Sequence, residues 1–353
     1  MTGRDEAGAA APGPGAADRL RLFSILSSPW VAQSCYALAK FGIPDLMAEG
    51  PRPVAELAAA SGTDPRALYR ILRALTAAGL VTEPAAGRFG LTPVTQPLRT
   101  GVPRSSRDAA VIFGEEVFRS FAEIGYTLRT GKPAFDKVYG TPFYDYLADN
   151  PDAAETFSTA MGGAGLPAVL ASLDLDGLRT VVDVGGGNGG LLCRVLRTHP
   201  QTRGILLDLR PALVQARERV AKAGFADRVE FAEGSFFDTM PAGADAYVLC
   251  RVLHNWPDED ALRLLRRIRG AMAADGRLIV IEDFVAQAAG PDSDVPPSGQ
   301  VRDLLILLML SGCDRTEAEY RDLLARAGFA IRAVRPFPPG GRSTESAIEA
   351  VPV

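Results

Sequence analysis

Histidine, tryptophan and cysteine are scarce in this chain of 353 residues, which has two, two and four of them respectively. Cys35, Cys193, Cys250 and Cys313 lie far apart, and no histidine stands near them at metal-ligand spacing. The sequence therefore predicts no metal site. Isolated cysteines of this kind are typical of small buried side chains in a reducing compartment, which predicts a cytoplasmic protein.

Long apolar runs and an excess of positive charge are also absent. The longest apolar run, Leu304 to Leu310, has seven residues, far fewer than the ~20 that span a bilayer. Lys and Arg total 38 against 42 Asp and Glu, a net charge of −4. These numbers exclude a membrane-spanning protein and a basic nucleic-acid coat. Residues 1–18 are rich in Ala, Gly and Pro without the pattern of a signal peptide, which predicts a disordered tail.

Residues 19–110 are predicted to form a mainly helical domain that ends in a β-wing. Apolar residues from Trp30 to Leu46 recur at helical spacing and predict one long first helix. A short helix over 54–60, followed by a turn and a helix start at Asp64-Pro65, predicts a helix-turn-helix. Two short apolar runs on either side of a turn at 84–87 complete the pattern of a winged helix.

Two features of the first half of the chain allow two interpretations each. Arg66, Arg70 and Arg73 share one side of the second helix of the helix-turn-helix. They either read a DNA major groove or form a solvated or interface-facing polar stripe. Residues 111–165 predict a helical connector rich in aromatic side chains. These rings either pack a core between two domains or line a pocket for a flat substrate.

Residues 166–353 alternate apolar strands with helices, a pattern typical of an α/β domain with a doubly wound parallel sheet. The last two strands have no helix between them, which predicts a terminal antiparallel hairpin. A segment rich in Pro, Gly and Asp at 286–299 predicts a surface loop. The predicted strands cover residues 181–184, 204–208, 229–231, 246–250, 278–282, 329–334 and 346–350.

A glycine-rich loop follows the first predicted strand of this domain. Gly185, Gly187 and Gly190 fit G-x-G-x-x-G between a strand and a helix, and Asp208 ends the next strand. Alone this is a weak dinucleotide fingerprint. Asp183, inside the strand, is better placed to organise the loop or to meet an ammonium group. S-adenosylmethionine carries an ammonium, a sulfonium and a ribose but no phosphate, so it suits a site formed by Asp183, this loop and Asp208.

Three motifs stand in order along this half of the chain, at Val182–Gly189, Gly234–Asp238 and Leu253–Asp260. With them the chain resembles the class I S-adenosylmethionine-dependent O-methyltransferases, and the resemblance covers nearly its whole length. The similar group includes plant caffeate and flavonoid methyltransferases and actinobacterial enzymes of natural-product biosynthesis. The resemblance implies methylation of a phenolic hydroxyl on an aromatic small molecule. It also implies that the winged helix forms a homodimer, which argues against DNA as a partner.

The resemblance further implies which residues hold the cofactor. Gly185 would lie against it, Asp208 would take the ribose hydroxyls, and Ser235 and Phe236 would flank the adenine. Cys250 falls where the family places another cofactor contact. The family commonly has Asp where this chain has Ser235, so the adenine amino group loses a charged acceptor, although a hydroxyl still accepts a hydrogen bond.

His254 follows the fourth strand at the carboxyl edge of the sheet, where a histidine either has a capping or core role or takes a proton from a bound ligand. The resemblance implies the second, so His254 is the predicted general base. Glu282 and Asp314 match the acids that hold the base in the family. Asp314 has a second interpretation as a helix cap, because it stands at a helix start. Plant relatives carry Glu there, so the reach of Asp314 is shorter. Asp283 is expected to face solvent, and His199 to lie on the surface.

Two other functions stay open from the sequence. One is a relative that binds the cofactor but uses it for chemistry other than methylation. The other is a winged-helix regulator that binds DNA and senses a small ligand through its second domain. The presence of His254, Glu282 and the acid Asp314 favours methyl transfer over other chemistry with the cofactor.

Overall fold

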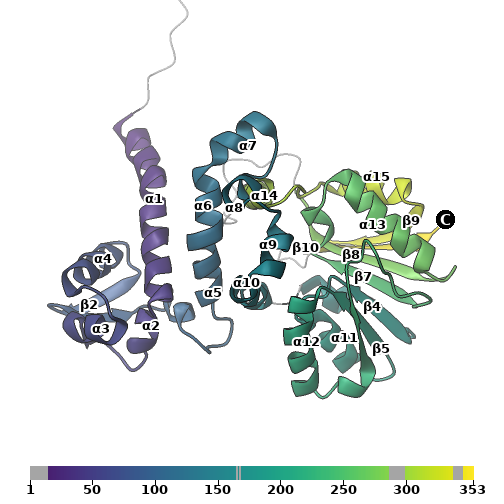
Figure 1. Ribbon diagram of the computed structural model, residues 1–353, viewed down its shortest axis with the longest axis horizontal. Coiled ribbons are helices and arrows are strands. Elements are labelled where there is room, and N and C mark those ends of the chain that lie inside the picture. The colour runs from purple at the N-terminus through teal and green to yellow at the C-terminus, as the bar shows by residue number, and fades with distance from the viewer. Residues whose placement is uncertain (1–14, 164–165, 167, 286–298, 337–344) are drawn as a thin grey trace, which may run out of the picture. The chain divides into compact units, whose positions relative to one another are not determined.

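The computed structural model describes residues 15–163, 166, 168–285, 299–336 and 345–353 (Figure 1). The chain divides into two compact units, Met1–Pro103 and Arg104–Val353. Most of the predicted tail and nearly all of the predicted 286–299 loop lie outside the described residues. Within the described ranges, no helix is both long enough and apolar enough to cross a membrane.

The first helix, α1 (Ala16–Lys40), begins inside the segment that the sequence predicts as a tail. It ends earlier than its apolar pattern suggests, so the prediction of one helix through Leu46 is wrong. Gly42 adopts a left-handed conformation with φ of 66°, which L side chains rarely adopt and which ends a helix. The chain then restarts as α2 (Ile43–Leu46).

The helix-turn-helix and the wing are confirmed. The helices are α3 (Val54–Ser61) and α4 (Pro65–Ala77), and the Asp64 carboxylate caps α4 by accepting bonds from the backbone N–H groups of Arg66 and Ala67 at 3.0 and 2.8 Å. The wing is a three-stranded antiparallel sheet in the order β1-β3-β2. Its strands and the turn that follows are β1 (Arg52–Pro53), β2 (Val81–Ala85), β3 (Arg88–Leu91) and the 3₁₀ turn Gln96–Leu98.

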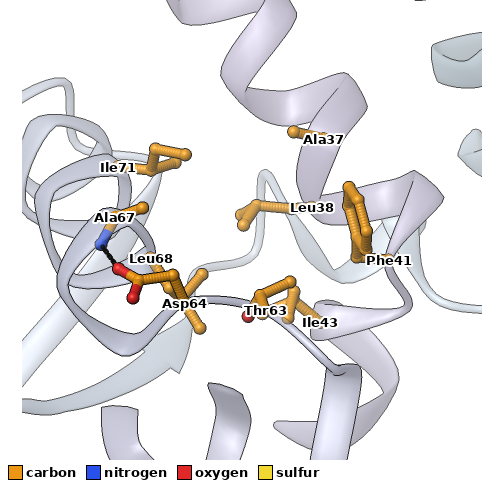
Figure 2. Close-up of a pocket in the computed structure, with 9 residues that line it drawn as sticks. All are labelled: Ala37, Leu38, Phe41, Ile43, Thr63, Asp64, Ala67, Leu68 and Ile71. Carbon is orange, nitrogen blue, oxygen red and sulfur yellow. Dashed lines mark hydrogen bonds between the residues drawn. The ribbon is translucent and has the colours of Figure 1, made fainter. Parts of the chain in front are cut away.

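A cavity of about 130 Å³ remains in this unit where α1, α2 and α4 meet. Figure 2 shows the capped start of α4 on one side of it and the end of α1 on the other. Apart from Thr63 and Asp64, its lining is apolar: Ala37, Leu38, Phe41, Ile43, Ala67, Leu68 and Ile71. The apolar side of α1 is therefore only partly covered within its own unit.

Short helices open the second unit and carry an aromatic cluster. Phe135 is fully buried, stacks on Tyr139 and meets Phe143 edge-on. This part of the connector is therefore a packed core within the second unit, whereas the first of its two interpretations predicts a core between two domains. The helices are α5 (Arg107–Ile112), the π-helical turn Phe113–Val117, α6 (Phe118–Ala122), α7 (Ile124–Thr130), α8 (Ala134–Tyr139), α9 (Phe143–Asp149), α10 (Pro151–Gly163) and the 3₁₀ segment Ala168–Ser172.

The predicted seven-stranded sheet is present in the order β6-β5-β4-β7-β8-β10-β9. The first five of these pair in parallel, and crossover connections join the parallel strands that follow one another in the chain. The last strand of the chain lies antiparallel between its two neighbours, as predicted. The strands are β4 (Thr180–Val184), β5 (Arg203–Asp208), β6 (Val229–Glu233), β7 (Ala246–Cys250), β8 (Arg277–Asp283), β9 (Phe329–Arg335) and β10 (Glu345–Pro352).

Helices cover both faces of this sheet (Figure 1). Alternate residues of β4 show the two faces, since Val182 packs with α13 and α15 whereas Val181 packs with α11. Asp183, Asp208 and Glu282 stand in the last two residues of β4, β5 and β8, at the carboxyl edge where open parallel sheets bind ligands. The helices on these faces are α11 (Gly190–Thr198), α12 (Arg210–Lys222), α13 (Asp258–Ala271) and α15 (Glu317–Arg326), with 3₁₀ turns at Ala226–Arg228 and Leu253–Asn255. Helix α14 (Gly299–Met309) packs instead against α6, α7 and α8.

Candidate active site

The glycine loop follows β4 and is tied to the end of β5. Gly185 has φ of 69°, and a Cβ there would stand 3.0 Å from Val252 Cγ2 and 3.6 Å from the Phe236 ring. Only glycine meets both the conformation and the space. A hydrogen bond fixes the loop to the end of β5, because the Gly187 N–H donates to Asp208 Oδ2 at 2.8 Å.

Two carboxylates flank this loop. Asp183 is 1% exposed, and among the described residues its Oδ2 has no hydrogen-bond partner. Burial and the nearby Asp208 carboxylate raise the pKa of Asp183 to about 7. Asp208 accepts the N–H groups of Gly187 and Leu209, at 2.8 and 2.7 Å. An unpartnered buried carboxylate oxygen of this kind calls for a cation or a donor from a ligand.

Of the remaining predicted cofactor residues, Ser235 and Phe236 follow β6, and Cys250 ends β7. Ser235 Oγ accepts the Phe237 N–H at 3.1 Å and so supports its own turn. The Phe236 ring meets Trp256 edge-on at 5.8 Å, and Tyr144 of α9 stacks on the same indole at 6.0 Å. Burial raises the pKa of Cys250, which keeps this thiol neutral. The site thus has an aromatic wall beside its acids.

His254 lies on the short turn after β7, and its side chain is 13% exposed. Its Nδ1 is 3.2 Å from Asp314 Oδ1 and 3.4 Å from Glu282 Oε2. Burial lowers the pKa of His254, but Glu282 and Asp314 outweigh burial and leave the pKa above its ordinary value. Because both acids face Nδ1, the neutral ring carries its proton there and leaves Nε2 as the acceptor.

Glu282, which is fully buried near the end of β8, has two roles at once. Its Oε1 accepts the N–H groups of Val252 and Leu253 at 2.9 and 2.8 Å. Its Oε2 is the oxygen that faces His254. The same carboxylate therefore positions the turn that carries the histidine and sets the charge beside the ring.

Asp314 does not cap a helix. The cap of α15 is Thr316, whose Oγ1 accepts the Glu319 N–H. The expectation that Asp283 faces solvent is also wrong: its side chain is 9% exposed and forms an ion pair with Arg302. His199 ends α11 with its ring near the helix carbonyl of Val195 and the exposed Asp176, away from the acids that face His254.

Comparison with known proteins identifies the family. Residues 121–330 match the model of the O-methyltransferase domain, and residues 23–100 match that of the O-methyltransferase dimerisation domain. The chain belongs to the O-methyltransferase family. It is an S-adenosylmethionine-dependent O-methyltransferase of the class I fold, as the sequence motifs predict.

Two curated relatives of this methyltransferase align along most of its length. The phenazine O-methyltransferase PhzM of Lysobacter antibioticus is 38% identical over 94% of this chain and 96% of the relative. The O-demethylpuromycin O-methyltransferase of Streptomyces alboniger is 40% identical over 89% and 84%. These relatives methylate aromatic natural products, which supports a biosynthetic methylation reaction here.

A solved structure resembles the methyltransferase closely. It is the O-methyltransferase NcsB1 from neocarzinostatin biosynthesis, in complex with S-adenosylmethionine and 2-hydroxy-5-methyl naphthoic acid. The two chains superpose with a TM-score of 0.82 and 34% identity over 97% of this chain and 100% of the other. The residues of the present site fit the same cofactor, since the unpartnered Asp183 oxygen suits an ammonium group and the Phe236 ring suits an adenine.

Sequence reasoning missed two residues that shape the histidine turn of the methyltransferase. Arg315 is 2% exposed and donates to the carbonyls of Leu253 and Trp256 at 3.0 and 2.8 Å, closing the turn around His254. Gly312 packs so closely against this turn that a Cβ would overlap its backbone from His254 to Trp256. Arg315 directly follows the predicted Asp314, but no local pattern shows contacts across some sixty residues.

Proposed function

We propose that this enzyme methylates a phenolic hydroxyl of an aromatic small molecule and that His254 is the general base. The observation that carries the proposal is the contact of His254 Nδ1 with two buried carboxylates, Glu282 and Asp314. A free phenol has a pKa of about 10, so very little of it is ionised at neutral pH. A base at the acceptor oxygen removes this obstacle.

The proton route follows from the ring's orientation. Nδ1 donates to the carboxylates, so Nε2 accepts the phenolic proton, and the carboxylates stabilise the imidazolium that results. S-adenosylmethionine, when bound, supplies a methyl group activated by its sulfonium. The electron pair of the phenolic oxygen forms the new C–O bond as the C–S bond breaks and its pair returns to sulfur.

Cofactor binding falls to the residues around the glycine loop. Asp183 would meet the ammonium group, Asp208 the ribose hydroxyls, and Phe236 the adenine, with Gly185 giving the backbone its close approach. The hydroxyl of Ser235 supports its own turn, and its second lone pair could accept a bond from the adenine amino group.

The acceptor would lie beside the aromatic wall. Tyr144 and Trp256 are stacked with an angle of 19° between their rings, and burial together with the negative charges of Asp208 and Glu282 raises the pKa of the Tyr144 hydroxyl. A neutral hydroxyl and flat rings beside the base suit an aromatic acceptor.

The enzyme is proposed to act as a homodimer built on its N-terminal unit. Large apolar side chains of α1 are exposed, with Trp30 at 67%, and an apolar face of this size marks an interface. The other exposed ones in α1 are Leu20, Leu22, Phe23, Ile25, Leu26 and Val31. Light scattering at micromolar concentration should give twice the chain mass of 37.4 kDa. A monomer mass would refute this part of the proposal.

The deciding experiment for the reaction is product analysis. The enzyme is incubated with S-adenosylmethionine and a panel of phenols, naphthols and hydroxylated heterocycles, and the products are read by mass spectrometry. A gain of one methyl group on a hydroxylated ring supports the proposal. Cofactor binding with no methylated product from any phenol, together with conversion of the scaffold by other chemistry, would overturn it.

A further inference from the structure

Helix α14 carries Arg302, whose guanidinium pairs with Asp314, one of the two acids that contact His254. Arg302, 32% exposed, reaches two carboxylates that lie on different elements. Its Nε and Nη2 donate to Asp314 Oδ2 at 3.2 and 2.8 Å, and its Nη1 donates to Asp283 Oδ2 at the end of β8. The guanidinium therefore bridges the sheet edge and the segment before α15.

This bridge leaves Asp314 with both carboxylate oxygens engaged. Oδ1 contacts His254 Nδ1 at 3.2 Å, while Oδ2 accepts two bonds from Arg302. The backbone N–H of Asp314 also donates to Asp303 Oδ1 at 2.8 Å. Two consecutive residues of α14 thus hold Asp314, one by its side chain and one by its backbone.

We propose that Arg302 is a positioning residue for methyl transfer, which fixes the Asp314 carboxylate against Nδ1 of His254 and anchors it to β8 through Asp283. The inference rests on the proposed function, in which His254 is the base. A planar guanidinium suits this task because its donors are held in a rigid fork, whereas a lysine ammonium is a single point of charge.

The charges around His254 come from several elements. Glu282 of β8 and Asp314 raise its pKa, and Arg302 of α14 lowers it. Three further groups stand beyond the two acids. Tyr144 of α9 interacts electrostatically with Glu282. Tyr320 of α15 interacts with both acids and with Arg315. Loss of Arg302 therefore has two opposite effects on the imidazole: a cation disappears, and Asp314 is released.

A double-mutant cycle read by NMR separates these effects. The chain has two histidines, so ring resonances of ¹³C-labelled histidine give the pKa of His254, with His199 as an internal control. Asp314→Asn removes a charge that raises the pKa of His254 and so should lower it. In the Arg302→Met background this drop should shrink to less than half, because Asp314 no longer sits on Nδ1.

The opposite result is equally clear. If Asp314 stayed in place without Arg302, the drop in the pKa of His254 would be as large as before or larger, since no cation would oppose it. That outcome overturns the proposal. The NMR measurement needs no acceptor substrate. It therefore tests the role of Arg302 even if His254 is not the general base.

Turnover gives the second readout. Arg302→Met should lower kcat about 10- to 100-fold, the range expected when a reacting group is misplaced, with an unchanged Kd for S-adenosylmethionine. The loss should not multiply with that of Asp314→Asn, and Arg302→Lys should restore part of it. Arg321→Met, which breaks an exposed ion pair on α15, is the matched control and should keep full turnover.

Multiplying losses in the double variant would show that Arg302 acts independently of Asp314 and would refute the inference. If Arg302→Met fails to fold, Asp283→Asn is the second test, because it loosens the far end of the bridge and leaves the guanidinium on Asp314. It should lower kcat, as Arg302→Met does, but by less. A normal kcat would count against the proposal.

Discussion

Replacement of His254 by Gln tests the proposed chemistry most directly. Glutamine keeps an N–H that can donate to Asp314, so the turn after β7 should keep its shape. It cannot take a proton at neutral pH. General-base catalysis contributes about 10²- to 10⁴-fold, which is roughly 3–5 kcal/mol of transition-state stabilisation. Turnover of a phenol should fall by that factor.

The structure also predicts what should not change. The contacts of His254 run to Glu282 and Asp314, whereas the proposed cofactor contacts lie at Asp183 and Asp208. The Kd for S-adenosylmethionine, measured by calorimetry, should therefore stay within about twofold of that of the native enzyme.

The pH profile supplies the refuting result. In the native enzyme the rate should rise with pH through the pKa of His254, which the two carboxylates hold above its ordinary value. In His254→Gln the rate should keep rising toward the pKa of the phenol at about 10, so part of the loss returns at high pH. Near-normal turnover at pH 7 on the true acceptor would show that proximity and alignment carry the reaction without a base.

Three further substitutions test the site. Asp183→Asn should weaken S-adenosylmethionine binding about 10²-fold by calorimetry, as loss of a buried charge pair does. It should also raise the Tm of the cofactor-free enzyme, more at pH 8 than at pH 5. The reason is that a folded-state pKa of about 7 makes the Asp183 carboxyl group destabilise the folded protein at any pH above its unfolded-state pKa. An unchanged Kd for S-adenosylmethionine would contradict the assignment of Asp183. Glu282→Gln should shift the acid limb of the pH–rate profile of His254 to lower pH, and a shift to higher pH would disprove the charge effect. Gly312→Ala should lower kcat by displacing the turn up to Trp256, and an unaltered kcat would show that the turn yields freely.

Much of the catalytic unit could be predicted because its strands are buried on both faces. Such strands appear as continuous apolar runs, and those at 181–184 and 246–250 lie within β4 and β7. The first helix was harder to delimit, since its apolar spacing continues past Gly42, and periodicity cannot detect a left-handed residue. Tertiary packing decides such ends.

The residues of the candidate site, like the elements of the fold, were predicted only in part. His254, Glu282 and Asp314 were predicted together through the resemblance to the family, and the structure places Nδ1 of His254 within 3.4 Å of a carboxylate oxygen of each acid. Asp283, the neighbour of Glu282, was expected to face solvent. Its carboxylate instead pairs with Arg302, which lies on a helix 19 residues further along, and no local pattern announces such a contact.

The double role of Glu282 restricts how this active site can change. One of its oxygens holds the backbone of the histidine turn and the other faces the imidazole, so a single substitution alters both the location of the ring and its charge. Attempts to redirect the enzyme to new acceptors should therefore leave this glutamate untouched and vary Tyr144 of α9, whose ring stacks on Trp256 in the wall of the site. A library built on that separation should retain turnover in most members, whereas one that includes position 282 should contain mainly inactive chains.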